Sequence, residues 1–475
     1  MVFSSLTFLC VFLPVTFALY CVLPGLKAKT ILLIAASLLF YAYGEPVYVL
    51  LMIGSALGNY LFALLIGNAR KAAVKKAAMV AAAALNLGVL GVFKYAGFAV
   101  ESLNAVTGLG LAVPAITLPI GISFFTFQAL SYVIDVYRAQ VPAEKSFLNI
   151  LLYISFFPQL IAGPIVKFHD VNEALSHRRQ TLDGVETGLR RFICGLGKKV
   201  IVANVMGQAA DAVFGAESGA LNSPLAWLGA VTYMLQIYYD FSGYSDMAIG
   251  LGRMFGFTFK ENFNYPYTAL NVQDFWRRWH ISMSTWFKEY LYIPLGGNRK
   301  GKARTAINKI IVFFCTGLWH GANWTFVVWG LYHGAFLLLE NYVPAVKKLP
   351  KAVGKIYTWA VVCIGFVFFR AESIGQGASF VGKMFAGFFT GPESHALLMR
   401  QLTPWFLFVF VIAVLGAGLL EKPIARVKAL ANGEDGSPKA KAARIILDAL
   451  SLALLVWCVT RLSAQGYNPF IYFRF

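Results

Sequence analysis

The chain has 475 residues, of which 58% are hydrophobic and only 13% are charged, and its net charge is +19 at pH 7. Soluble domains contain about 25% charged residues, so the composition excludes a soluble protein and indicates an integral membrane protein. The sequence also supports a nucleic-acid-binding function poorly. The basic residues cluster between apolar runs, as the positive-inside rule predicts for membrane loops, and no soluble basic domain carries them.

The apolar runs predict an all-α polytopic membrane protein with roughly 10 to 12 membrane segments. The first run lacks the basic start and the cleavage pattern of a signal peptide, so we expect it to be retained as a helix. In chain order the candidate spans are Val2–Leu23, Thr30–Tyr43, Val47–Ile66, Ala78–Phe98, Leu118–Val136, Leu148–Ile165, Leu225–Leu251, Ile307–Leu339, Ile356–Phe369, Trp405–Leu420 and Ile445–Val459.

Two short segments predict the orientation of the chain in the membrane and an interruption of one of its apolar runs. The basic loop Arg70–Lys76 follows the third span, and placing it in the cytoplasm puts the N-terminus outside. The stretch Phe157–Pro164 interrupts an apolar run with two prolines and a glycine. Such irregular backbone is tolerated at membrane depth only where it is buried in protein or lines a cavity, so we expect a re-entrant element.

His320 is the most informative residue because it lies inside an otherwise apolar segment. The run before it, Ile310–Leu318, has 9 residues and the run after it, Trp324–Leu339, has 16. A spanning helix needs about 20 residues, so the two runs together predict a broken or re-entrant segment. An ionisable group there is by default a functional hypothesis. The imidazole can act as general base, and Asn323 can orient the ring or donate to an oxyanion.

His333 follows His320 by 13 residues. On a continuous helix this separation corresponds to about 220° of rotation, so the two rings would not share a face. We therefore interpret His333 as structural.

A second histidine lies in the aromatic stretch Asn271–Trp286. Helical spacing would place Trp276, His280 and Ser284 on one face. The alternative is an interfacial helix that holds its tryptophans at headgroup depth and places Arg277 and Arg278 on lipid phosphates. That alternative accounts well for the tryptophans and arginines and less well for His280.

From Arg277 to Arg304 the chain carries seven basic residues against one acidic residue, Glu289. This charge is typical of a cytoplasmic loop. It also suits a landing site for an anionic donor, either the phosphates of coenzyme A or an acidic carrier protein. The two interpretations are compatible.

Asp240 and Asp246 lie in an apolar segment, six residues apart, so they do not face each other on a helix. A hydrogen-bonded scaffold is favoured over a proton or ion relay. The six cysteines have no paired spacing, and no H-E-x-x-H pattern occurs, so neither disulfides nor metal catalysis is expected.

Several stretches together resemble the membrane-bound O-acyltransferase (MBOAT) superfamily, and within it the bacterial branch of alginate O-acetylation, peptidoglycan O-acetylation and teichoic-acid D-alanylation subunits. They are Met1–Ser5, Leu39–Glu45, Leu118–Phe127, Phe156–Ile165, Tyr239–Asp246, Asn262–Tyr267, Asp274–His280, Gly317–Asn323 and Phe470–Phe475. The resemblance runs nearly end to end, and the two histidine-bearing stretches are specific.

The resemblance implies that His320 is the principal catalytic histidine and His280 a second, polar position. It implies a ring of tilted helices around a thin centre, crossed by a tunnel. It also implies one membrane domain, with N-terminal helices in 1–140, a catalytic core with re-entrant elements in 141–345 and C-terminal helices in 346–475. The residues expected to line the tunnel or bind the donor are Trp276, Arg277, Arg278, Trp319, Asn323 and Asp240.

The bacterial branch further implies a multi-pass protein of the cytoplasmic (inner) membrane with no permanently bound cofactor. The acyl donor would be acetyl-CoA or an acyl carrier protein. The acyl group would pass to a separate extracytoplasmic SGNH-type acyltransferase, which modifies a polysaccharide. D-alanyl transfer to teichoic acid remains an alternative. A secondary transporter and a non-catalytic export scaffold also remain open, although the absence of an internal repeat disfavours a transporter.

Overall fold

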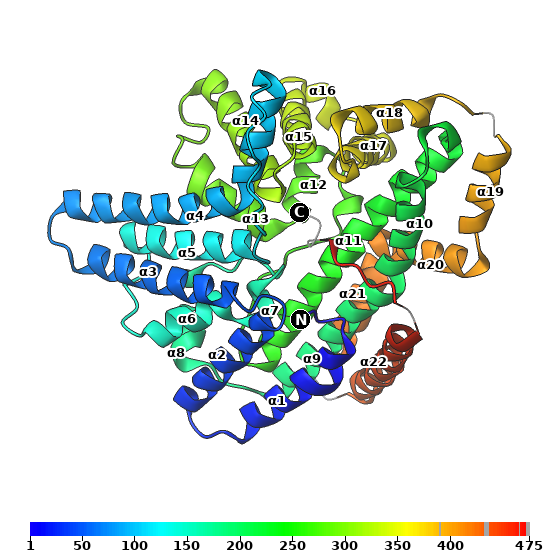
Figure 1. Cartoon of the computed structure of the whole chain (residues 1–475). Coiled ribbons are helices and arrows are strands. Elements are labelled where there is room, and N and C mark those ends of the chain that lie inside the picture. Colours follow the sequence, from blue (N-terminus) through cyan, green and yellow to red (C-terminus); the bar gives the residue numbers. More distant parts are fainter. Residues whose placement is uncertain (389–390, 432–436, 465, 472–475) are drawn as a thin grey trace. The chain divides into compact units, whose positions relative to one another are not determined.

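The structure is a computed structural model that describes residues 1–388, 391–431, 437–464 and 466–471 (Figure 1). These residues form helices and connecting loops, and no strand occurs among them, which confirms the all-α prediction. The chain divides into two compact units, one of residues 1–192 with 245–260 and the other of residues 193–244 with 261–475. Helices α9 (Leu182–Gly197) and α11 (Ser223–Met254) contribute residues to both units. The three subdivisions expected from the sequence stay a prediction.

In the first unit, helices α3 (Tyr48–Asn68), α4 (Ala72–Thr107) and α5 (Ile122–Tyr137) pack side by side (Figure 1). Asn59 of α3 and Asn86 of α4 exchange two amide hydrogen bonds of 2.7 and 3.1 Å. Lipid provides no hydrophobic force between apolar helices, so buried polar pairs of this kind help to hold them together. The helices of this unit are α1 (Leu13–Val22), α2 (Leu26–Ala42), α3 (Tyr48–Asn68), α4 (Ala72–Thr107), α5 (Ile122–Tyr137), α6 (Phe147–Ser155), α7 (Phe157–Leu160) and α8 (Phe168–His177).

The predicted interruption at Phe157–Pro164 is confirmed. Helix α6 ends at Ser155, and the next helix, α7, has only four residues before the chain becomes irregular. Every residue from 151 to 168 is buried. The irregular backbone is therefore enclosed by protein, as such backbone must be in a membrane.

The second unit contains the two histidine-bearing stretches. Its helices are α10 (Asn204–Phe214), α12 (Val272–Arg278), α13 (Ile281–Phe287), α14 (Gly301–His320), α15 (Trp324–Tyr342), α16 (Pro344–Lys347), α17 (Lys351–Arg370), α18 (Ile374–Phe385), α19 (Pro392–Gln401), α20 (Pro404–Val414), α21 (Glu421–Ala431) and α22 (Pro438–Ala464).

Helices α14 and α15 form an antiparallel hairpin that turns at Gly321–Asn323, so the predicted break in this segment is confirmed. Glycines bring the two backbones into contact. A Cβ atom at Gly317 would lie 2.3 Å from the carbonyl oxygen of Phe326, and one at Gly330 would lie 2.3 Å from that of Phe313. No larger residue fits at either position without separating the helices.

Four helices in the described residues are long and apolar enough to cross a membrane, namely α3, α4, α17 and α22. Helices α19 and α20 form a fifth candidate, bent by 70°. The predicted first span is shorter than expected, because its helix covers only Phe8–Val22. Together with the family assignment below, these helices make the chain a multi-pass membrane protein.

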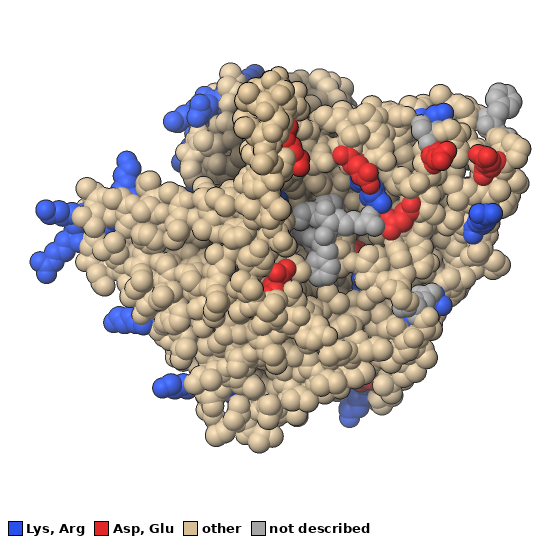
Figure 2. All heavy atoms as spheres, in the orientation of Figure 1, with Lys and Arg blue, Asp and Glu red and all other residues tan. Residues whose placement is uncertain are grey.

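The surface charge agrees with a membrane setting. Most of the face in Figure 2 is uncharged, and most of its basic side chains lie along the margin of that face. Arg70 and Lys71 in the connection between α3 and α4 are exposed, as is Lys76 near the start of α4. Apolar residues of α22 such as Ile445 and Leu450 are 68% and 61% exposed, which suits helix faces that contact lipid.

Candidate active site

His320 is the last residue of α14 and lies at the tip of the α14–α15 hairpin, where it is 6% exposed. Three aromatic rings meet its imidazole edge to face, each with centroids 5.0 Å apart. They are Trp319, Trp329 and Phe369. The ring therefore lies in an apolar, largely dry environment, as expected for an ionisable group inside an apolar segment.

A small cavity borders this imidazole, and we call it the His320 cavity. Its volume is about 10 Å³, which is close to the space that a single water molecule occupies. Only a small reacting group fits there without movement of the walls. The cavity is lined by Ile237, Phe241, Trp279, His320, Trp329, Phe366, Phe369 and Ile471.

His280 is fully buried, but it does not lie on a helix. Helix α12 ends at Arg278 and α13 begins at Ile281, and His280 between them has a left-handed backbone with φ 44° and ψ 55°. The prediction that Trp276, His280 and Ser284 share one helical face is therefore wrong, because the helix stops before His280. Both helices have seven residues, too few to span a membrane. Burial lowers the pKa of His280 to about 3, so this ring is neutral.

Trp319 connects the two histidines. Its ring contacts His320 at 5.0 Å and His280 at 5.7 Å, both in edge-to-face geometry. Phe241 packs on His280 at 4.6 Å and also lines the His320 cavity. The structure therefore brings His280, Trp319 and His320 into one aromatic cluster.

The alternative of an interfacial helix is wrong for the tryptophans of this stretch. Trp276, Trp279 and Trp286 are 7%, 2% and 7% exposed, so protein covers them.

Helix α12 is fixed at its start by Glu340 of α15. This side chain is 1% exposed and accepts hydrogen bonds from the amides of residues 272 and 273 at 2.6 and 2.9 Å. Sequence reasoning missed Glu340, although an acidic residue ending an apolar run was a signal.

His333 lies nearer to His320 in the fold than expected. Residues 320 and 333 do not lie on one continuous helix, so the rotation of about 220° expected between their side chains does not apply. Trp329 contacts His320 at 5.0 Å and His333 at 5.2 Å, so both rings pack on one indole. His333 is fully buried and also contacts Trp276 at 5.2 Å, which suits the structural role predicted for it.

Asn323 does not orient the His320 ring, contrary to expectation. Its Oδ1 accepts a hydrogen bond from the backbone amide of Thr325 at 2.9 Å and thereby caps α15. Its Nδ2 donates to the carbonyl oxygen of Glu372 at 3.1 Å. In the structure this side chain ends the turn and starts the second arm of the hairpin. Donation to an oxyanion stays a prediction.

Asp240 forms a buried ion pair with Lys199, at 2.8 Å, with side chains 1% and 4% exposed. Its Oδ2 also accepts a hydrogen bond from the amide of Ile471, which lines the His320 cavity, and Lys199 donates to the carbonyl oxygen of Pro469. The scaffold interpretation of Asp240 is confirmed, because this pair holds a segment whose residue Ile471 lines the cavity. Residues 472–475 of the predicted C-terminal motif lie outside the described residues.

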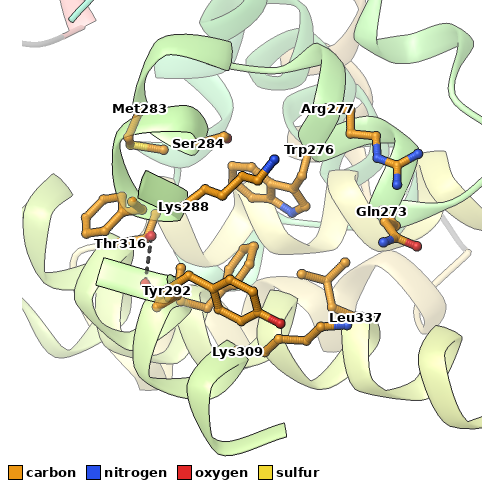
Figure 3. A pocket seen from close by; sticks show the side chains of 13 residues that line it. Gln273, Trp276, Arg277, Met283, Ser284, Lys288, Tyr292, Lys309, Thr316 and Leu337 are labelled. Atoms are coloured by element: carbon orange, nitrogen blue, oxygen red, sulfur yellow. Dashed lines mark hydrogen bonds between the residues drawn. The ribbon is translucent and has the colours of Figure 1, made fainter. Parts of the chain in front are cut away.

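A larger pocket of about 220 Å³ adjoins α12, and we call it the basic pocket (Figure 3). Arg277, Lys288 and Lys309 give it three cationic side chains, whereas Arg278 is held by Asp274 at 3.1 Å and does not line it. The other lining residues are Gln273, Trp276, Met283, Ser284, Phe287, Tyr292, Val312, Phe313, Thr316 and Leu337.

The buried indole nitrogen of Trp276 has no hydrogen-bond partner in the described chain. Figure 3 shows this nitrogen turned toward the space between Lys288 and Gln273. Buried donors are normally satisfied, so an unmatched one beside a pocket indicates a place for a ligand acceptor. Within the described residues, no group of three or more His, Cys, Asp or Glu side chains is arranged to hold a metal ion.

Comparison with known proteins agrees with this geometry. A model of the membrane-bound O-acyltransferase family matches residues 136–371, which include both histidines. The chain is 41% identical, over the whole length of both proteins, to a "Probable alginate O-acetylase AlgI" of Pseudomonas putida. It is 38% identical to the "Peptidoglycan O-acetyltransferase" of Helicobacter pylori over 79% of this chain and 78% of that protein.

A "Teichoic acid D-alanyltransferase" of Bacillus subtilis is more distant, 28% identical over 53% of this chain and 69% of that protein. The 41% identity to the alginate relative over the full length of both proteins, and the 38% identity to the peptidoglycan relative over more than three quarters of each, settle the class of protein. The chain belongs to the membrane-bound O-acyltransferase family and is a multi-pass membrane O-acyltransferase.

Proposed function

We propose that this protein moves an acetyl group from a cytoplasmic donor across the bacterial cytoplasmic membrane for O-acetylation of an extracytoplasmic polysaccharide such as alginate or peptidoglycan. The names of the relatives with near 40% identity support this acyl group and this class of acceptor. The observation that carries the proposal is the position of His320, which is buried at the hairpin tip beside a cavity of about 10 Å³.

The chemistry that suits this position is general base catalysis of acyl transfer. The imidazole of His320, in its neutral form, takes the proton from an attacking hydroxyl or thiol as its oxygen or sulfur bonds to the donor's carbonyl carbon. The bond between that carbon and the donor sulfur then breaks, and the imidazolium returns the proton to the leaving thiolate. His280 adds a second imidazole to the same cluster, and burial lowers its pKa so that it is neutral at physiological pH.

The basic pocket suits the donor. Coenzyme A and acyl carrier proteins both present a phosphorylated pantetheine thioester, which combines anionic phosphate with amide carbonyls and an apolar arm. Arg277 and Lys288 supply positive charge, and the Trp276 indole N–H supplies an unused donor for a carbonyl. Trp276 touches Trp329 at 5.6 Å, and Trp329 lines the His320 cavity, so the pocket and the cavity share one aromatic wall.

Under this proposal, transfer of the acetyl group to the polysaccharide requires a partner protein. An SGNH-type acyltransferase outside the membrane receives the acetyl group and modifies the polymer. D-alanyl transfer is less well supported than acetyl transfer, because the D-alanyl relative is only 28% identical and matches about half of this chain.

The test is reconstitution of the purified protein in proteoliposomes, with radiolabelled acetyl-CoA on the side of the basic stretch Arg277–Arg304 and a soluble polysaccharide on the other. With an SGNH-type partner beside the polymer, label should enter the polysaccharide as an O-ester. The protein alone should give no modified polymer. Robust O-acetylation without a second protein would contradict the relay, and exchange flux without transfer would support a carrier.

A further inference from the structure

Asn262 and Asn264 hold the backbone on the two sides of His280. Residues 262–264 lie beside residues 278–281. The amide of Ile281 donates to the carbonyl oxygen of Asn262, and the amide of Asn264 donates to that of Arg278, both at 2.9 Å. Asn262 is fully buried. A left-handed backbone at a non-glycine residue is strained and persists only where its surroundings hold it, and Asn262 provides part of that hold for His280.

The hydrogen bonds of the Asn262 side chain also determine which ring nitrogen of His280 carries the hydrogen. Its Oδ1 accepts from the backbone amide of Ser282 at 3.1 Å and from the Ser282 hydroxyl at 2.9 Å. A backbone N–H can only donate, so the atom that faces it must be the amide oxygen and not the amide nitrogen. The same oxygen lies 3.3 Å from Nδ1 of His280. An oxygen that only accepts requires Nδ1 to carry the hydrogen.

The other ring nitrogen, Nε2, then has a lone pair. It is buried and has no hydrogen-bond partner among the described residues. The side chains placed against the ring are Asn262, Ser282, Phe241 and Trp319, and none of them is charged. The neighbouring guanidinium of Arg278 is paired with Asp274. Buried acceptors are normally satisfied, so Nε2 of His280, in the cluster with Trp319 and His320, is open to a donor that the described residues do not supply.

We propose that Asn262 is a positioning residue that fixes His280 in the Nδ1–H tautomer, so that Nε2 accepts a hydrogen bond from a hydroxyl, thiol or amide N–H of the reacting substrate. The inference rests on the proposed acyl transfer at the His320 cavity, and it adds a residue and a ring atom that the proposed function does not assign. Because burial lowers the pKa of His280, this lone pair remains available across the physiological pH range.

The direct test is nitrogen NMR of protein labelled only in histidine and reconstituted in lipid. The His280→Gln protein identifies the His280 signals by difference. Wild-type protein should show a protonated Nδ1 and an unprotonated Nε2 from pH 5 to 8. An Nε2–H tautomer would overturn the inference. This measurement needs no turnover, so it is decided separately from the proposed function: absent transfer by wild-type protein would contradict only the latter.

Two substitutions link the tautomer to the reaction. Asn262→Leu removes the oxygen at similar volume, and should lower kcat for acetyl transfer by about tenfold or more with little change in the donor KM. Asn262→Asp keeps the oxygen, so it should retain the tautomer and restore most of kcat at alkaline pH. The negative charge of the new carboxylate stabilises the protonated form of His280 and raises its pKa. The acidic limb of the profile of kcat against pH should therefore move to higher pH.

A matched control is Asn308→Leu. Asn308 is also fully buried, but its amide donates to the carbonyl oxygens of Leu295 and Gly297. This change should lower stability and leave the His280 signals as in wild type. Equal losses of kcat in Asn262→Asp and Asn262→Leu, with an unchanged pH profile, would reduce Asn262 to a structural residue and overturn the inference.

Discussion

Trp329 packs edge to face on His320, with ring centroids 5.0 Å apart and planes at 88°. The same indole contacts His333 at 5.2 Å, and it is 1% exposed. Two buried histidines therefore share one aromatic neighbour, but only His320 lines the small cavity. His333 thus provides a matched comparison for His320, because a change at either ring disturbs the same packing.

The basic pocket should determine donor affinity through Arg277. Replacing Arg277 with Gln should raise the KM for acetyl-CoA with little change in kcat, and the effect should shrink at high salt because exposed charges are screened. Arg278→Gln is the matched control, since Asp274 already holds that guanidinium outside the pocket. Steady-state kinetics at low and high ionic strength measure both. Equal KM changes for the two variants would argue against the pocket as the donor site.

The hairpin should not tolerate a methyl group at Gly317. The Cβ of Gly317→Ala would meet a backbone oxygen at 2.3 Å, so the helices must separate, and overpacking of this kind costs about 1–3 kcal/mol. We expect a lower melting temperature and reduced transfer. Gly382→Ala in α18 is the control, because no atom lies within 4 Å of its Cβ position. Thermal unfolding in detergent compares the two, and equal melting temperatures would contradict the close approach.

The buried pair of Lys199 and Asp240 should be more sensitive to single than to double replacement. Asp240→Asn leaves a buried cation without its counter-charge, which costs about 3–5 kcal/mol. It should also increase hydrogen exchange in residues 467–471, which the pair anchors. The double variant Lys199→Met with Asp240→Leu should recover much of the stability. A double variant as unstable as the sum of the single variants would contradict this coupling.

The burial of His280 predicts how stability depends on pH. In the unfolded chain this ring binds a proton near its ordinary pKa of 6.5, whereas in the folded protein it does so only at about pH 3. Between these values the unfolded state holds the additional proton, so stability falls as the pH falls. The contribution approaches about 1.4 kcal/mol per pH unit. His280→Gln should show a shallower loss of melting temperature between pH 7 and 5, and an unchanged slope would contradict the burial.

The sequence was sufficient to predict features that depend on local pattern. An ionisable residue between two short apolar runs predicted both the importance of His320 and the break that follows it. The prolines at 158 and 164 predicted the irregular buried segment. These predictions need only the chain's periodicity and the cost of a polar group in lipid.

Features that depend on tertiary contact could not be predicted in this way. Helical spacing treats residues 272–287 as one helix, whereas the backbone bonds of residues 262 and 264 hold His280 in a left-handed turn. The 220° argument for His333 failed because glycine contacts fold α15 back along α14. Asp240 could not be paired with Lys199 from the sequence, because 41 positions separate them.

The most direct test compares His320→Gln with His333→Gln in a single-turnover assay of labelled acetyl transfer, with donor binding and melting temperature measured on the same preparations. If His320 is the general base, His320→Gln should lose on the order of 10²–10⁴-fold in transfer rate while it still binds acetyl-CoA. His333→Gln should stay within a few-fold of wild type for transfer, although its melting temperature falls. Transfer by folded His320→Gln protein at a rate near that of wild type would contradict the account.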